Sequence, residues 1–157
     1  MRKPAIPRSR TRRHLLQSVG ALAVARWLPA QAAAIDVADI PTLGAFLAGR
    51  TPRWERVQLD LPRLADNGLA VPMKLAVDGP FAPGPDVRSI HLFSEKNPVP
   101  QIAVFEFPVA VDRIEIESRI RLAGSQRVVA VATMSDGALF AASAEVVVTL
   151  AACLDEP

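Results

Sequence analysis

The stretch of sequence that decides the fold is residues 128–150, VVAVATMSDGALFAASAEVVVTL. Residues 128–134 are apolar on both faces of an extended chain, which is typical of a central strand. Ser135-Asp136-Gly137 follows, and Asp-Gly between apolar runs is the strongest short signal for a β-hairpin. After the turn, every second residue from Phe140 to Leu150 lies on one apolar face. We therefore predict a hairpin whose second strand runs to the C-terminal end of the domain.

Upstream stretches that alternate apolar and polar residues, as half-buried strands do, are 57–61, 69–77 and 113–122. In the last of these, isoleucines on one face alternate with arginines and glutamates on the other. Residues 87–93 are a further expected strand. Pro72 interrupts the second stretch and lacks a backbone N–H, so we expect a sheet edge or a bulge there.

One short helix is predicted, over Pro41 to Leu47, with Thr42 as its N-cap and Leu43 and Phe46 on its apolar face. Proline-rich stretches separate the strands in the middle of the chain. About seven strands, with turns at sandwich-like spacing and little helix, predict an all-β fold: an immunoglobulin-like β-sandwich.

The first 32 residues have the composition of a removable export signal. Six basic residues and no acid lie in positions 2–13, an apolar stretch follows, and Ala30-Gln31-Ala32 is a small-x-small cleavage pattern. The apolar stretch is shorter than the roughly twenty residues of a membrane span. Arg12-Arg13 followed by Leu15-Leu16 favours the twin-arginine route; a disordered basic arm is the alternative. We predict a signal peptide over 1–32, a sandwich domain over 33–150, a flexible C-terminal tail over 151–157, and a periplasmic protein without a membrane span.

Cleavage of the signal would reverse the net charge. Seven of the 18 lysines and arginines precede position 33 and no acid does, which leaves 11 basic against 16 acidic residues, a balance of −5. The basic character of the whole chain therefore belongs to the signal, and nucleic-acid binding has no support.

Cys153 is the only cysteine. A single thiol in an oxidising compartment cannot form an internal disulfide. Isolated cysteines are often small buried hydrophobes, but Cys153 lies on a short polar tail, where chain ends are commonly exposed. We expect an accessible thiol that can form mixed disulfides or persulfides by exchange.

The remaining residues offer little other chemistry. His91 is the one histidine after the predicted signal, and with Cys153 it supplies too few ligands for a structural zinc site. A structural histidine with satisfied hydrogen bonds is the favoured interpretation, and a Cys–His nucleophile is the alternative. The sequence contains no G-x-S-x-G, G-x-G-x-x-G or P-loop motif. Glu115 and Glu117 are more simply a solvated or partner-facing surface. We predict no catalytic residues, no metal and no resident cofactor.

The mature sequence resembles the SoxY family, the sulfur-carrier subunits of the periplasmic sulfur-oxidation (Sox) system. The Glu95-Lys96-Asn97-Pro98 stretch and the Met134 to Gly137 turn are its most specific matches. The resemblance extends, in order, over Asp66–Pro72, His91–Pro100, Arg119–Ala123, Val128–Gly137 and Ala144–Thr149.

The resemblance implies an immunoglobulin-like domain that pairs with a second sandwich protein, SoxZ. It also implies that Cys153 takes up thiosulfate as a thiosulfonate conjugate, which partner enzymes oxidise and hydrolyse to release sulfate. In this interpretation the chain is a carrier rather than an enzyme, and its only cargo is the sulfur bound covalently to Cys153.

The tail departs from the family pattern. SoxY tails typically read Gly-Gly-Cys-Gly-Gly, whereas this one reads Ala151-Ala152-Cys153-Leu154-Asp155-Glu156-Pro157. The added bulk and negative charge disfavour a narrow channel and anionic thiosulfate. Three hypotheses follow: a covalent sulfur carrier, a divergent scaffold paralogue that pairs with a SoxZ-like subunit without loading thiosulfate, and a stand-alone redox enzyme, which no second thiol supports.

Overall fold

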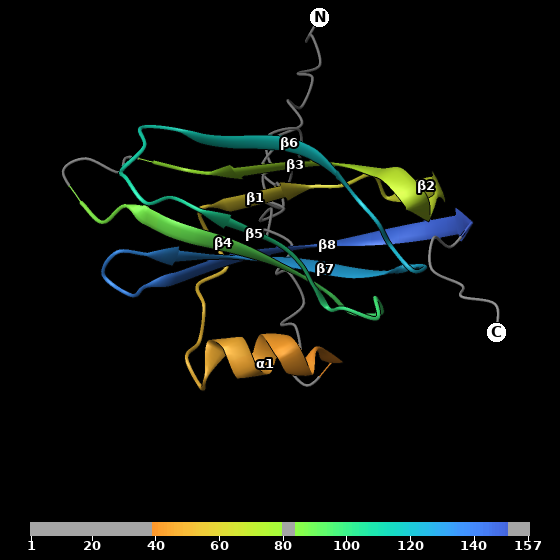
Figure 1. Cartoon of the computed structure of the whole chain (residues 1–157), viewed down its shortest axis with the longest axis horizontal. Helices are drawn as coiled ribbons and strands as arrows, with labels where there is room; N and C mark the ends of the chain where they lie inside the picture. Colours follow the sequence, from red (N-terminus) through yellow and green to blue (C-terminus); the bar gives the residue numbers. More distant parts are fainter. Residues whose placement is uncertain (1–38, 80–83, 151–157) are drawn as a thin grey trace, which may run out of the picture. The chain divides into compact units, whose positions relative to one another are not determined.

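The fold is a sandwich of two β-sheets with one short helix outside it (Figure 1). A computed structural model describes residues 39–79 and 84–150. The smaller sheet has the order β1-β3-β6: β1 (Val57–Asp60), β3 (Val71–Val77) and β6 (Ile114–Ile120). The larger sheet has the order β2-β8-β7-β4-β5: β2 (Leu64–Asn67), β8 (Leu139–Leu150), β7 (Gln126–Met134), β4 (Val87–Ser94) and β5 (Gln101–Glu106). The predicted immunoglobulin-like sandwich is confirmed.

The β7–β8 hairpin forms around the predicted Asp-Gly turn. The Gly137 N–H donates to the Met134 carbonyl (3.0 Å), and the Met134 N–H donates to the Ala138 carbonyl (2.9 Å). Gly137 has a φ of 84°, a conformation that residues with a Cβ rarely adopt. The Asp136 carboxylate accepts the Ala138 N–H (2.9 Å) and closes the turn. Both residue types that marked the turn in the sequence are therefore required by its geometry.

Strand β7 is buried on both faces, as its continuous apolar pattern predicted. Val128, Ala130 and Ala132 belong to the core between the two sheets. Val129 and Val131 point the other way, into a second apolar cluster beneath the helix. All five side chains are fully buried, so β7 is the layer that joins the two parts of the core.

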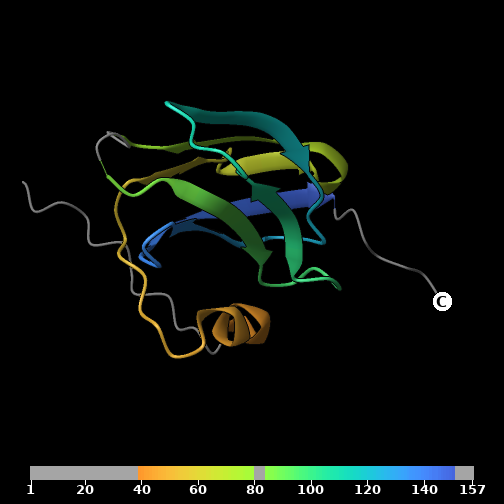
Figure 2. The same ribbon diagram turned by 60° about the vertical axis from the view of Figure 1, so that its left-hand side comes forward.

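The helix, α1 (Pro41–Leu47), covers the outer face of the larger sheet (Figure 2). Its bounds are those predicted, but the predicted N-cap is wrong. Ile40 occupies the cap position, no side chain caps the helix, and Pro41 lies in the first turn. Proline suits this position because it has no N–H to leave unsatisfied. Ala48, with a φ of 48°, ends the helix.

The described residues contain eight strands rather than about seven. Strands β2 and β5 were not predicted. The four residues of β2 show one buried side chain and no alternation, and no residue of β5 is fully buried. Strand β2 is also parallel to β8, a pairing that no hairpin signal marks. The predicted strand from residue 69 begins at Val71, after a 3₁₀ turn over Gly68–Ala70. Pro72 pairs with Arg119 of β6 but lies beyond the end of β1, which is the local edge expected of a proline.

His91 is a packing residue beneath the helix. Its ring centroid lies 4.4 Å from that of Phe46, and its Nε2 lies 3.1 Å from the Ser89 hydroxyl. Nδ1 is buried and has no hydrogen-bond partner among the described residues. Burial lowers the pKa of His91, and the negative charge of Glu106 opposes that shift. The packing agrees with a structural role for His91, but the expectation that its hydrogen bonds are satisfied is wrong for Nδ1.

Replacing Gly137 by alanine should destabilise the hairpin through the backbone alone. An added Cβ would meet nothing within 4 Å, so the cost is that of the left-handed conformation, about 1–2 kcal/mol in the free energy of unfolding. Gly124→Ala is the matched control, because its Cβ also meets open space and its φ is not positive. Urea unfolding should show a change within about 0.5 kcal/mol for the control. Equal losses in the two variants would contradict this explanation.

The His91 environment predicts a pH dependence of stability. Because the folded-state pKa lies below the ordinary value of about 6.5, the unfolded chain binds the proton more readily. The free energy of unfolding should therefore fall as the pH drops below about 6.5 and through the lower folded-state pKa. His91→Gln should flatten this part of the profile in urea unfolding followed across the range. A profile that is identical in the two proteins would refute the assignment.

Candidate functional site: the anchored end of strand β8

The candidate site is the end of β8, from which the tail with Cys153 continues. Cys153, the rest of residues 151–157 and the predicted signal over 1–32 lie outside the described residues. Cys153 is three residues beyond Leu150, the last residue of β8. Three residues span at most about 10 Å, so whatever fixes the end of β8 also fixes the origin of this short arm.

The last residues of β8 extend past the hairpin partner. Pairing with β7 begins at Gln126 opposite Val146, so residues 147–150 have β2 as their strand neighbour instead. The Val147 N–H donates to the Arg63 carbonyl (2.9 Å), and the Thr149 hydroxyl donates to the Asp66 carbonyl (2.7 Å). One of the two strands that the sequence did not reveal thus supports the origin of the tail.

Ser125 holds the opposite edge of β8 at the same level. Its hydroxyl accepts the Val148 N–H (2.9 Å) and lies 3.3 Å from the Val148 carbonyl, to which it donates. A single side chain thereby replaces the missing β7 backbone at this point. With β2 on one edge and Ser125 on the other, the backbone of β8 is bonded on both sides two residues before its end.

The Glu95-Lys96-Asn97-Pro98 stretch holds the loop that carries Ser125. The Asn97 amide donates to the Arg121 carbonyl (2.8 Å) and accepts the Ala123 N–H (2.9 Å). The buried Gln126 side chain donates to Asn97 Oδ1 (2.9 Å), and Lys96 Nζ donates to the Ser125 carbonyl (2.7 Å). The most specific piece of the sequence resemblance therefore has a structural role, since it fixes the loop against which β8 ends.

The surface around the end of β8 is apolar. Leu64 of β2 and Val147 of β8 are register partners and are 59% and 55% exposed, and Leu150 is 66% exposed. The sequence placed Leu150 on the same apolar face as Val146 and Val148, and this face becomes exposed toward the end of the strand. The alternation is obeyed as far as Val146, which is buried, and Val148, which is half-buried. Leu150 has the same parity but lies at the end of the strand and is solvent-exposed.

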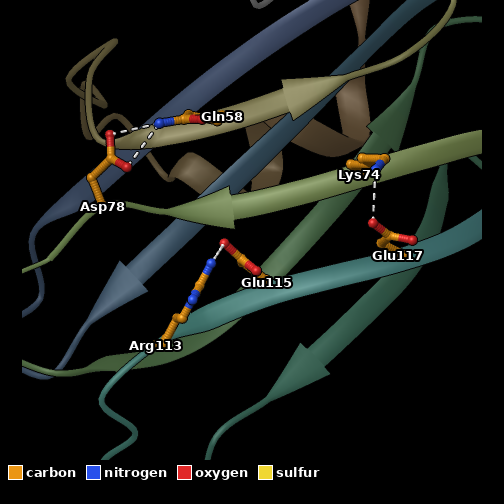
Figure 3. Close-up of polar contacts among 6 residues, drawn as sticks. All are labelled: Gln58, Lys74, Asp78, Arg113, Glu115 and Glu117. Carbon is orange, nitrogen blue, oxygen red and sulfur yellow. Dashed lines mark hydrogen bonds and ion pairs between the residues drawn. The ribbon is translucent and has the colours of Figure 1, made fainter.

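The outer face of the smaller sheet carries paired charges (Figure 3). Lys74 Nζ lies 2.8 Å from the Glu117 carboxylate, and Arg113 pairs with Glu115. The Gln58 amide donates to both carboxylate oxygens of Asp78 (2.8 and 3.0 Å). The hydrogen bond to Glu117 and its negative charge raise the pKa of Lys74. These groups are solvent-exposed and paired with one another, which fits the solvated surface expected of Glu115 and Glu117.

Other chemical sites are sparse in the part of the chain that the structure describes. Within it, no three histidine, cysteine, aspartate or glutamate side chains are placed to hold a metal ion. No described helix is long and apolar enough to cross a membrane. The structure does not test whether Cys153 and His91 form a nucleophile pair. His91 is packed beneath α1, and Cys153 lies outside the described residues.

Comparisons with known proteins agree with the sequence resemblance. The model of the family described as "Sulfur oxidation protein SoxY" matches residues 44–153. The solved structure of the sulfur carrier protein SoxY from Chlorobium limicola f thiosulfatophilum is 29% identical, with a TM-score of 0.55; the match covers 68% of this chain and 94% of that one.

Two less similar structures are superoxide reductases. The neelaredoxin from Ignicoccus hospitalis is 15% identical (TM-score 0.47; 60% of this chain, 80% of that one). A putative superoxide reductase from Thermotoga maritima is 18% identical (TM-score 0.48; 60% and 87%). No curated protein matches. Because the family match spans most of the sequence and the Chlorobium limicola carrier shares the fold, the chain belongs to the SoxY family of sulfur oxidation proteins.

Proposed function

We propose that this protein carries sulfur covalently on Cys153 and presents it to the enzymes of the Sox system. The observation that carries the proposal is the family match, which begins at residue 44, within α1, and ends at Cys153 itself. The only thiol of the chain thus follows, three residues on, a strand end that is hydrogen-bonded on both edges. The described domain positions the thiol and is recognised by the partner enzymes, and these enzymes carry out the chemistry.

The loading step requires an oxidant. Joining thiosulfate to the Cys153 thiolate forms one sulfur–sulfur bond and removes two electrons, which a partner oxidoreductase must accept. Hydrolysis of the conjugate then adds water, releases sulfate and leaves a persulfide on the cysteine. Throughout the cycle the protein has to keep the sulfur at the end of a short arm. The anchored end of β8 meets this need, because hydrogen bonds hold Val148 and Thr149 only four to five residues before Cys153.

Export and pairing are further parts of the proposal. The basic N-terminal segment with Arg12-Arg13 supports export by the twin-arginine route to the periplasm. Family membership supports pairing with a SoxZ-like subunit, and the conjugating, sulfur-oxidising and hydrolysing Sox enzymes are the expected further partners.

A divergent scaffold paralogue is the second candidate. The observation that favours it is the tail, in which alanines, leucine and acids stand where the family typically has glycines. Such a protein would keep the domain and its SoxZ-like partner but would not load thiosulfate. Loading of Cys153 therefore distinguishes the two candidates.

Cys153→Ser should abolish sulfur loading and leave the fold intact. The exported chain would be incubated with thiosulfate and the conjugating Sox enzymes, and its intact mass would be recorded without reductant. We expect an adduct on the native protein and none on the variant, with equal thermal midpoints, because Cys153 lies beyond the sandwich core. An adduct of equal size on the variant would rule Cys153 out as the attachment site.

Ser125→Ala should loosen the origin of the arm without removing the thiol. The variant loses the hydroxyl that bonds both backbone groups of Val148, which costs about 1 kcal/mol of stability. Amide exchange should accelerate at residues 147–150, and transfer of loaded sulfur to the partner enzymes should slow, while loading persists. Ser143→Ala, on the same strand but without a side-chain hydrogen bond among the described residues, is the control. Unchanged exchange at 147–150 would contradict the anchoring role.

A further inference from the structure

A groove lies along one side of the sandwich, where the larger sheet ends in β5 and the smaller sheet ends in β6. Strand β5 pairs only with β4, and β6 pairs only with β3, so each is an edge strand. A groove of about 510 Å³ lies between them. Its apolar lining includes Met73, Ile102, Phe105 and Ile120. The unpaired backbone groups of an edge strand can hydrogen-bond an extended peptide.

The groove is positively charged on a domain whose net charge is negative. Arg119 and Arg121 are its only charged lining residues, and no acid lines it. Neither guanidinium has an ion pair or a hydrogen bond among the described residues. By contrast, the hollow on the outer face of the smaller sheet is lined by Asp60, Glu115 and Glu117 with a single lysine. The groove therefore fits an extended acidic segment that has an apolar side chain.

The C-terminal segment of this chain has that composition. Leu154 supplies an apolar side chain and is followed directly by Asp155 and Glu156. These are the residues that stand where the family typically has glycine or no residue at all. An acidic, leucine-containing tail and a cationic apolar groove on the same chain are complementary in charge and in hydrophobicity.

The origin of the tail and the groove lie at the same end of the sandwich. Asn97 and Arg121 line the groove, and both belong to the hydrogen-bond network that fixes Ser125 against Val148. From β8 to β5 there are three steps between neighbouring strands, about 15 Å in all. In an extended chain the Cα of Leu154 lies up to about 14 Å from that of Leu150, and the Cα of Glu156 lies up to about 20 Å from it. Leu154 can therefore reach the near edge of the groove, and Asp155 and Glu156 can lie within it.

We propose that the groove between β5 and β6 binds residues 154–157 of the same chain. The short tether gives the segment an effective concentration in the millimolar range, so weak contacts suffice to populate the bound state. Binding would hold Cys153 against the domain between the end of β8 and the groove. This inference concerns the tail segment and does not depend on which sulfur compound is carried.

A nitroxide at the end of the tail tests the proposal. The label would be attached to full-length protein carrying Pro157→Cys in a Cys153→Ser background, so the readout is independent of sulfur loading. In NMR spectra of the isotopically labelled chain, we expect paramagnetic broadening at Ile102 and Phe105 and none at Gln58 on the outer face of β1. Broadening confined to residues near Leu150 would overturn the proposal.

Charge reversal supplies the specificity control. Arg119→Glu with Arg121→Glu should reduce the bound population by about two- to fivefold per ion pair lost. Adding Asp155→Lys and Glu156→Lys should restore it, and about 1 M salt should weaken binding in the native protein. Arg88→Glu, on β4 and outside the groove lining, is the control for a change of net charge. Broadening at Phe105 that survives charge reversal would contradict the ionic part of the proposal.

Two other occupants are separate outcomes. Broadening that arises only between spin-labelled and isotopically labelled chains in a mixture would assign the groove to a second copy. A groove that is unbroadened in the isolated chain, and that becomes protected from amide exchange when a SoxZ-like subunit is added, would belong to that partner. Either result would overturn binding of the chain's own tail. Cys153 loading, measured separately, is unaffected by both.

Discussion

Burial of β7 on both faces is the constraint on which the rest of the structure depends. One face of this strand closes the core between the sheets, and the other supports helix α1. Each side chain from Val128 to Ala132 therefore packs against buried neighbours on one face of the strand or the other. A polar group at any of these positions would have no access to water. The Asp136-Gly137 turn then fixes β8 in register beside β7. The hairpin is thus the element against which both layers are placed.

In that register β8 extends past Val146, which is its last residue paired with β7. A strand that outruns its partner exposes backbone hydrogen-bonding groups, and here β2 and the Ser125 hydroxyl satisfy them. The Asn97 network stiffens the loop that carries Ser125. The domain thereby holds the last strand to within a few residues of Cys153. In the carrier role that we propose, this anchoring fixes the point from which the thiol is presented.

The sequence predicted the parts of this arrangement that depend on local chemistry. Continuous apolar character identified β7, Asp-Gly identified the turn, and alternation identified β6. It did not predict β2, whose parallel pairing with β8 joins residues more than 80 positions apart and has no turn signal. It also misplaced the helix cap on Thr42, because the residue at which a helix begins depends on neighbours in space. The residues of the Asn97 network could be noticed only as a match to the family. Their spacing in the sequence does not indicate that they hydrogen-bond to one another.

In the function that we propose, Cys153 carries sulfur in the cell. The most direct test is the mass of the peptide that contains Cys153, isolated without reductant and with alkylation controls from cells that are oxidising thiosulfate. We expect persulfide or thiosulfonate adducts on that peptide and on no other. A thiol that remains unmodified under these conditions would contradict sulfur carriage on Cys153 and would leave the scaffold paralogue as the better description of the protein.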